Sequence, residues 1–205
     1  MRWLTVVLLL WAGTALAAAP DADDLAKRMN QRLALHPVLR AEFVQEKTMA
    51  AFKKPLVTRG HLVFAQSQGI IWDIEAPLRL TYVLGEDRIV EIGADGRSQA
   101  KTALDVPGLA QVGKVFRALL GAQAGTLAEI FTIVPEGTTE AWRLVLTPKA
   151  GPLGQYLRQI QLAGGRHVER IRIDEASGDA TTIGFRNTTE DDVLSAKERQ
   201  RFGGR

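Results

Sequence analysis

The chain has 205 residues, of which 46% are hydrophobic and 24% are charged, and it contains no cysteine. Its 26 basic and 23 acidic residues leave a formal net charge of +3 and are interspersed along the chain, which argues against a nucleic-acid-binding protein. The lack of cysteine excludes disulfides, thiol catalysis and cysteine-ligated metal sites.

The first residues have the pattern of a secretory signal. A short positive start, Met1-Arg2, precedes an apolar run that ends in Ala15-Leu16-Ala17, with small residues where a signal peptidase cleaves. The run is shorter than the roughly 20 apolar residues of a membrane span. We therefore expect residues 1–17 to be a cleaved signal peptide, cut after Ala17, and residues 18–205 to form a single domain in the bacterial periplasm. Without a cysteine after the signal, this domain cannot carry a lipoprotein anchor.

Residues 21–35 are predicted to form a helix, because Leu25, Met29 and Leu33 repeat at four-residue spacing. The helix should end at His36-Pro37, since the residue before a proline avoids the helical conformation.

From Val38 onward the hydrophobic period changes to two, which is the period of a strand with one buried face. Short segments rich in glycine, proline and polar residues separate these runs, as in an antiparallel meander. The predicted strands are residues 38–44, 62–64, 70–74, 78–84, 89–92, 131–134, 142–147, 156–162, 167–174 and 181–186.

Helical spacing returns in the middle of the chain, where Val106, Leu109, Val112, Phe116 and Leu119 form one apolar stripe. One further helical turn is predicted near residues 126–129. Residues 190–202 are polar and are predicted to be a short terminal helix or a tail.

The predicted fold is mostly β, of the α+β class, with about nine or ten strands. A sheet of this length tends to curl, so we expect an antiparallel incomplete β-barrel with a helical lid over an apolar concave face. The sequence leaves open whether this face lines a lipid pocket or is a packed core. The residues predicted to line it are Phe43, Leu62, Phe64, Ile70, Trp72, Ile74, Leu80, Tyr82, Val112, Phe116, Leu119 and Trp142.

The sequence shows no set of catalytic residues. His36, His61 and His167 lie far apart without metal-ligand spacing, and Ser67 sits in a near match to G-x-S-x-G that joins two strands, whereas that motif requires a strand-to-helix turn. We therefore predict no enzyme activity, no metal site and no cofactor.

The predicted elements resemble the periplasmic outer-membrane lipoprotein carrier family, LolA, over residues 25–187. The resemblance depends on the order and spacing of several short motifs. These are Phe43-Val44-Gln45, Gly60-His61-Leu62 followed by Trp72 and Pro77, residues 85–89, residues 116–121, Trp142-Arg143-Leu144 with Pro148-Lys149, residues 171–174 and residues 178–185.

This resemblance implies a monomeric half-barrel whose cavity shields acyl chains. Members of the family receive lipoproteins from an ABC-type release complex of the inner membrane and pass them to an acceptor at the outer membrane. The resemblance therefore implies a carrier that binds a lipoprotein or other acylated lipid. The interspersed charges separately argue against nucleic acid as a partner.

One position departs from the family's pattern. The best-known members carry an arginine, followed by proline, in a hairpin loop, where it latches the lid by hydrogen bonds. That place is held here by Gln66, followed by Ser67. Glutamine can hydrogen-bond but lacks the guanidinium fork, so Gln66 is either the latch position of this chain or a plain hairpin residue.

Two alternative functions remain open beside the lipoprotein carrier. The same fold would serve a carrier of a different lipid, such as a glycolipid or a polyene-type product. A periplasmic sensor module that binds a partner protein is the other alternative, although no second domain or long interaction segment is apparent in the sequence.

Overall fold

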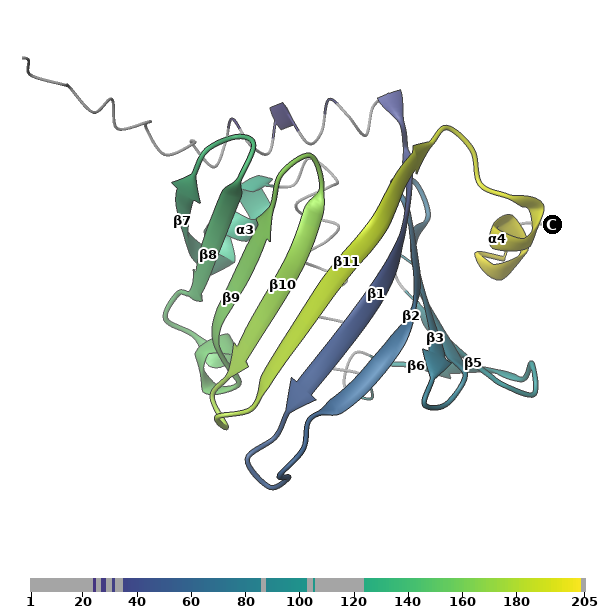
Figure 1. The fold of residues 1–205 in the computed structure, drawn as a ribbon, viewed down its shortest axis with the longest axis horizontal. Helices are drawn as coiled ribbons and strands as arrows, with labels where there is room; N and C mark the ends of the chain where they lie inside the picture. The colour runs from purple at the N-terminus through teal and green to yellow at the C-terminus, as the bar shows by residue number, and fades with distance from the viewer. Residues whose placement is uncertain are drawn as a thin grey trace, which may run out of the picture.

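One antiparallel sheet takes up most of the chain that the computed structural model describes, namely Asp24, Lys27, Arg28, Gln31 and residues 35–85, 88–102, 105 and 124–203 (Figure 1). The elements are β1 (Val38–Thr48), β2 (Leu56–Ala65), β3 (Gly69–Ala76), β4 (Leu80–Leu84), β5 (Ile89–Gly93), β6 (Ser98–Lys101), α3 (Ala124–Ile130), β7 (Phe131–Gly137), β8 (Trp142–Pro148), the 3₁₀ helix η1 (Pro152–Gln155), β9 (Leu157–Gly164), β10 (Val168–Glu175), β11 (Ala180–Asp191) and α4 (Ala196–Arg201).

The strand order is β6-β5-β4-β3-β2-β1-β11-β10-β9-β8-β7, so β1 lies in the middle and the sheet is not closed into a barrel. The first six strands form one meander and the last five form another. The two meanders are joined by the pairing of β1 with β11, in which Val38 lies opposite Asp191 and Thr48 opposite Ala180. The predicted fold class, a curled antiparallel sheet that stops short of a barrel, is confirmed.

The predicted strand count of nine or ten is too low, because the described sheet has eleven strands. The missed strand is β6, whose sequence Ser98-Gln99-Ala100-Lys101 has no apolar alternation. It pairs with β5 along the antiparallel backbone ladder, in which Gln99 lies opposite Glu91. The prediction for residues 78–84 was also too long, since β4 begins at Leu80 and Leu78 is 78% exposed in the turn after Pro77.

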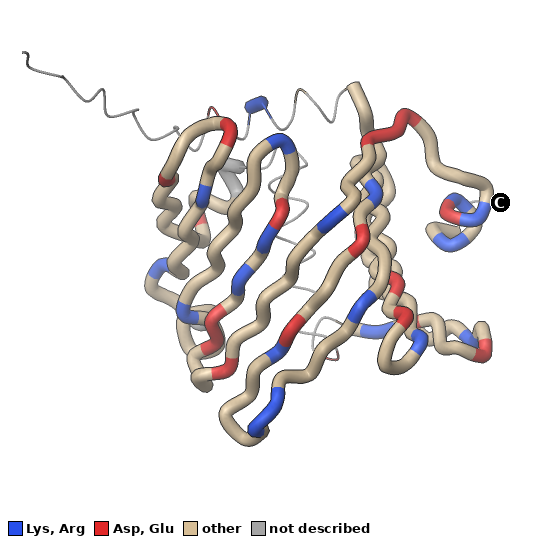
Figure 2. Tube along the Cα trace, viewed as in Figure 1, with Lys and Arg blue, Asp and Glu red and all other residues tan. Residues whose placement is uncertain are grey.

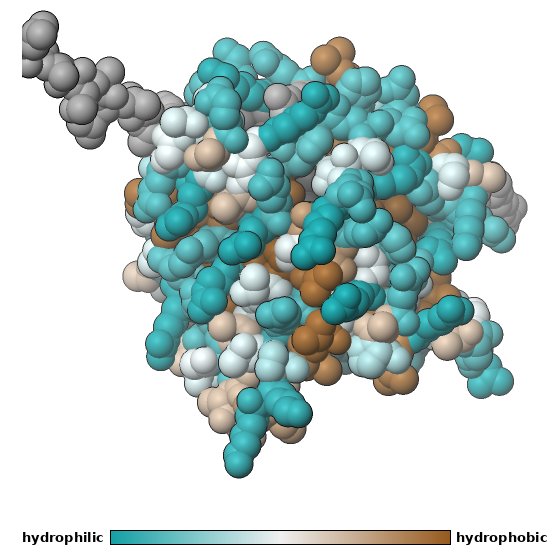
Figure 3. Space-filling view, viewed as in Figure 1, coloured by the Kyte–Doolittle hydropathy of each residue, from teal (hydrophilic) through white to brown (hydrophobic). Residues whose placement is uncertain are grey.

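The sheet buries side chains on both faces, and we call these the inner and the outer face. The inner face carries the larger apolar cluster, which includes Leu127 of α3, and α3 lies behind β8 and β9 in Figure 1. The outer face of the central strands is largely hydrophilic (Figure 3). Acidic and basic residues of both signs are spread along these strands (Figure 2).

A close approach between β2 and β3 accompanies the curl of the sheet. Their register shifts between Arg59 and Gly60. A Cβ atom on Gly60 would lie 1.8 Å from the carbonyl oxygen of Asp73, so this position requires glycine.

Residues 192–202, which we call the C-terminal clasp, cover an apolar patch on the outer face. Leu194 and Phe202 are buried in a second cluster with Val38, Ala65, Ile71 and Val83. The segment was predicted as a polar helix or tail from residue 190. The short helix is confirmed as α4, but it begins at Ala196, because residues 190 and 191 belong to β11. The segment is also not a free polar tail, since Leu194 and Phe202 are buried against the sheet.

Polar contacts fix the clasp at both ends of α4. Ser195 and Glu198 form a reciprocal capping box, and Glu198 accepts hydrogen bonds of 2.8 Å from both Nε and Nη2 of Arg40 on β1. Arg201 donates to Asp73 of β3 at 2.8 Å. These contacts tie the end of the described chain to β1 and β3.

Several predicted segments fall outside the described residues. They are the signal peptide of residues 1–17 and the helical stripe of residues 106–120. Of the helix predicted for residues 21–35, the described residues Asp24, Lys27, Arg28, Gln31 and Leu35 are helical. The helical turn predicted near residues 126–129 is confirmed as part of α3.

The Arg40–Glu198 pair should make the stability of the clasp depend on pH. The hydrogen bond from Arg40 is the main reason why the pKa of Glu198 is lowered to about 2. A carboxylate with a depressed pKa contributes stability above its ordinary pKa and loses that contribution as the pH falls toward the folded-state value. Glu198→Gln should therefore destabilise the protein at pH 7 by about 1.5–3 kcal/mol. Between about pH 5 and pH 2.5 the variant should lose less stability than the parent.

Urea unfolding at each pH measures this difference. Glu46→Gln, which removes an exposed carboxylate of β1, is the matched control and should follow the parent. Parallel pH curves for Glu198→Gln and the parent would show that the pair contributes nothing to stability.

Candidate functional site

The inner face of the sheet is centred on three aromatic side chains where the two meanders meet. The rings of Phe43 and Trp72 stack with centroids 4.0 Å apart, and Phe185 meets Trp72 edge-on at 6.3 Å. Phe43 and Phe185 are directly opposite each other on β1 and β11. Trp72 of β3 thus contacts both sides of the junction between β1 and β11.

Aliphatic side chains extend this apolar surface toward β7, because period-two alternation places them all on the same face. Each lies in the same buried cluster as the aromatic residues. They include Leu144, Leu146, Ile160, Leu162, Ile171, Ile173 and Ile183, together with Leu127 and Phe131 at the α3–β7 junction.

The structure places the described residues that the sequence predicted to line the concave face on this inner face. Six are fully part of the buried cluster, namely Phe43, Leu62, Phe64, Ile70, Trp72 and Trp142. Ile74 and Tyr82 are partly buried against it. Leu80 is half-buried opposite Ile74. Val112, Phe116 and Leu119 lie outside the described residues.

Sequence reasoning missed two kinds of inner-face residue. The aliphatic residues of β8 to β11 were visible in the period-two pattern but were not selected, because no aromatic residue marked most of them. The other kind is charged. Glu91 of β5 and Lys101 of β6 form an ion pair of 3.4 Å, and Glu91 lies opposite Tyr82 in the register of β4 and β5. A charged residue in a short strand gives no sequence signal of which face it occupies.

Gln66 is exposed in the hairpin between β2 and β3. Its backbone N–H donates to the carbonyl oxygen of Pro37 at 2.9 Å, which ties the hairpin to the residue before β1. Within the described part of the chain its side chain makes no hydrogen bond. The position is therefore free to accept a longer side chain.

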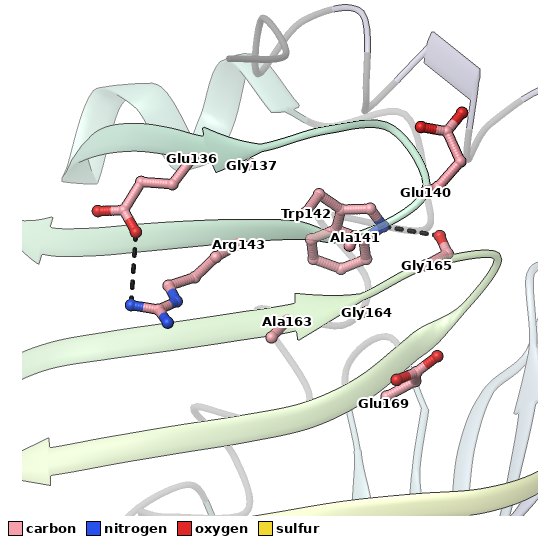
Figure 4. A pocket seen from close by; sticks show the side chains of 10 residues that line it. All are labelled: Glu136, Gly137, Glu140, Ala141, Trp142, Arg143, Ala163, Gly164, Gly165 and Glu169. Carbon is pink, nitrogen blue, oxygen red and sulfur yellow. Dashed lines mark hydrogen bonds and ion pairs between the residues drawn. The ribbon is translucent and has the colours of Figure 1, made fainter. Parts of the chain in front are cut away.

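A polar pocket of about 490 Å³ lies at the ends of β7 to β10 (Figure 4). Glu136, Glu140 and Glu169 line it together with Arg143, which pairs with Glu136 at 3.4 Å. The indole N–H of Trp142 donates to the carbonyl oxygen of Gly165 at 2.7 Å. Trp142, which also belongs to the buried cluster of the inner face, lies at the boundary between that face and this more highly charged pocket.

The three histidines each lie beside a carboxylate in a different part of the structure. His36 contacts Asp192, His61 contacts Glu75, and His167 contacts Glu190. Among the described residues no group of three or more histidine, aspartate or glutamate side chains could hold a metal ion. In the same part of the chain, no helix has both the length and the apolar character of a membrane span.

Comparison with known proteins gives one family match. Residues 17–183 match the family described as "Outer membrane lipoprotein carrier protein LolA-like". No curated protein sequence matches the chain.

Several solved structures have a similar course of the chain at low sequence identity. A LolA superfamily protein from Nitrosomonas europaea has a TM-score of 0.48 and 10% identity over 88% of this chain and 97% of that chain. For the MucA/MucB complex of Pseudomonas aeruginosa, the TM-score is 0.49 and the sequence identity is 12%, and the match covers 87% of this chain and 60% of that chain. For lipoprotein LppX of Mycobacterium tuberculosis, the TM-score is 0.42 and the sequence identity is 9%, and the match covers 84% of this chain and 98% of that chain.

Because Trp72 bridges the junction, its removal should destabilise the whole fold. Trp72→Ala should lower the free energy of unfolding by about 3–5 kcal/mol, the usual cost of deleting a large buried aromatic side chain. The matched control is Tyr156→Ala, which removes an aromatic ring that is 73% exposed and should change stability by about 0.5 kcal/mol or less. Urea unfolding followed by circular dichroism measures both, and equal effects would contradict the central role of Trp72.

Proposed function

The chain belongs to the LolA-like family of outer membrane lipoprotein carrier proteins, and from this premise we propose that it is a soluble periplasmic carrier of acylated cargo. In this proposal it shields the acyl chains of a lipoprotein during transfer from the inner to the outer membrane. The carrier binds its cargo and performs no catalysis on it.

The observation that carries the proposal is the continuous apolar inner face around Phe43, Trp72 and Phe185. Acyl chains in water cost about 0.8 kcal/mol per methylene, so one long chain costs on the order of 10 kcal/mol. A curled, open sheet with one apolar face supplies the surface that removes such a chain from water. The sheet is not closed, and in this proposal the acyl chain enters beside an edge strand.

The compartment is part of the same proposal. Residues 1–17 have the pattern of a cleaved signal peptide, and the chain has no cysteine that could receive a lipid anchor. We propose that residues 18–205 move freely in the periplasm as a monomer. An ABC-type release complex of the inner membrane would load the carrier, and an outer-membrane acceptor would unload it.

A second candidate keeps the fold and changes the cargo to another lipid, such as a glycolipid or a polyene-type product. Gln66 favours this candidate, because it replaces the arginine of the best-known carriers and its side chain is exposed. A carrier without that arginine need not follow the same loading cycle.

Acyl binding can be measured with the tryptophans of the protein itself. Of the four tryptophans, Trp3 and Trp11 lie in the predicted signal, so a chain starting at Ala18 contains only Trp72 and Trp142, both on the inner face. A diacylated lipopeptide with brominated acyl chains should quench their fluorescence, because bromine quenches indole at contact distance. The same peptide without acyl chains should cause no quenching.

Two matched variants locate the site. Phe43→Ala should weaken lipopeptide binding about tenfold or more, since it removes an aromatic ring from the inner face. Phe52→Ala removes a ring that is 63% exposed and should leave binding unchanged. Absence of quenching by the lipopeptide, or equal binding by the two variants, would contradict the proposal.

We also propose that Gln66 holds the latch position of the lid. Gln66→Arg should then stabilise the empty, closed form through a charge-assisted hydrogen bond of about 1.5–3 kcal/mol. This corresponds to a rise in melting temperature of roughly 3–10 °C and to weaker uptake of the lipopeptide. Gln68→Arg, which adds the same charge at an exposed position of the same hairpin, is the control. If Gln66→Arg melts and binds like the parent, Gln66 is a plain hairpin residue.

A further inference from the structure

The inner face changes character toward β6. The register continues from Trp72 of β3 to Tyr82 of β4, Glu91 of β5 and Gln99 of β6, so these four residues form one row on the same face. The row begins in the aromatic cluster and ends in polar side chains. The apolar surface therefore has a polar end in the wing formed by β4, β5 and β6.

Burial and charge both mark this end as unusual. Glu91 and Lys101 pair at 3.4 Å, with side chains that are only 24% and 20% exposed. Burial is the main reason why the pKa of Tyr82 is raised to about 12, and the charge of the Glu91 carboxylate and its hydrogen bond with the phenol add to the shift. Desolvating an ion pair costs free energy that the pair itself often does not recover.

The usual arrangement of polar and apolar side chains is reversed in β5. Val90 and Ile92 point to the outer face, where they pack with Val83 against the cluster that the C-terminal clasp covers. Glu91, between them, points to the inner face beside Tyr82. The fold thus covers the apolar side of this strand with a dedicated segment and leaves a carboxylate on the inner side.

Among the described residues, the strands of the opposite wing present no such charged or phenolic groups on their inner face. There β7, β8 and β9 present Phe131, Leu144, Leu146, Ile160 and Leu162, all of them buried apolar residues. One end of the inner surface is therefore apolar and the other carries a carboxylate, an ammonium and a phenol. This polarity fits a ligand that is itself polar at one end.

We propose that Tyr82, Glu91 and Lys101 form a subsite for a polar head group that carries a protonated amine next to an acceptor oxygen. Glu91 accepts from the amine, while Lys101 and the hydroxyl of Tyr82 donate to the acceptor oxygen. The acyl chains of the same ligand lie along the apolar residues of β7 to β11. The inference rests on the proposed function, since it names the head-group chemistry of the cargo.

Two sources offer this chemistry. A diacylated lipopeptide with a free α-amino group presents an ammonium beside its ester oxygens, and a phosphoethanolamine lipid presents an ammonium beside a phosphate. N-acetylation removes the positive charge of the amine, so the N-acetylated lipopeptide and the N-acetylated phosphoethanolamine lipid are the matched uncharged forms. All four compounds, and a fatty acid without an amine, can be compared by displacement of an apolar fluorescent dye.

The parent protein should bind at least one free amine on the order of tenfold more tightly than its N-acetylated form. The pair that shows this preference identifies the source. Glu91→Gln should abolish the preference and leave fatty-acid binding unchanged. Glu46→Gln, which removes a carboxylate from an exposed position on β1, should keep the preference of the parent.

The outcomes separate this inference from the proposed function. If none of the compounds, the fatty acid included, displaces the dye, the acyl carrier itself is contradicted. If all displace it but the parent shows no preference for either free amine, or Glu91→Gln keeps the preference, the head-group subsite is wrong and the carrier stands. If Glu91→Gln fails to fold, two other measurements still test the subsite. One is the comparison of free and N-acetylated amines in the parent, and the other is the milder Tyr82→Phe variant, which should bind the free amine more weakly.

Discussion

The stacking of Trp72 on Phe43 is the contact on which the rest of the sheet depends. The described sheet has two meanders, and within it the β1–β11 pairing alone joins them by backbone hydrogen bonds. Backbone pairing fixes the order of the strands but leaves the curl of the sheet free. Trp72 packs on Phe43 and meets Phe185, so it lies across the junction and draws β3 toward β11. This contact therefore ties the two meanders together on the inner face.

The curvature explains why the protein needs cover on both faces. Alternation along β7 to β11 gives one apolar and one polar face, which suits a sheet with water on one side. In β2 to β5 apolar residues point to both sides, and the outer ones would be exposed without Leu194 and Phe202 of the C-terminal clasp. The clasp therefore allows the inner side of β5 to carry Glu91, because the packing of that strand is supplied from outside.

Much of this fold follows from the sequence, since the two-residue period of apolar residues and the turns that interrupt it mark ten of the eleven strands. Phe43, Trp72 and Trp142 could be assigned to the inner face because their neighbours on both sides are polar or lie on the opposite face. The strand β6 could not be predicted, because Ser98 to Lys101 pairs through backbone groups that every sequence has. The burial of Leu194 and Phe202 also gave no signal, since two apolar residues eight apart among charges do not form a periodic stripe. Tertiary contact alone selects them.

The position of β1 in the middle of the sheet also sets an order of events during folding. Val38 can pair with Asp191 only after nearly all of the residues between them have been synthesised. Contacts between residues so far apart in the sequence form slowly. Because the chain is synthesised from the N-terminus, the first meander can form early, but one edge of β1 then has no partner strand. An unpaired edge of eleven residues can pair with other chains. During its synthesis this protein therefore passes through a stage in which the strand that will become its centre is an open edge, and that stage ends only when β11 pairs with it.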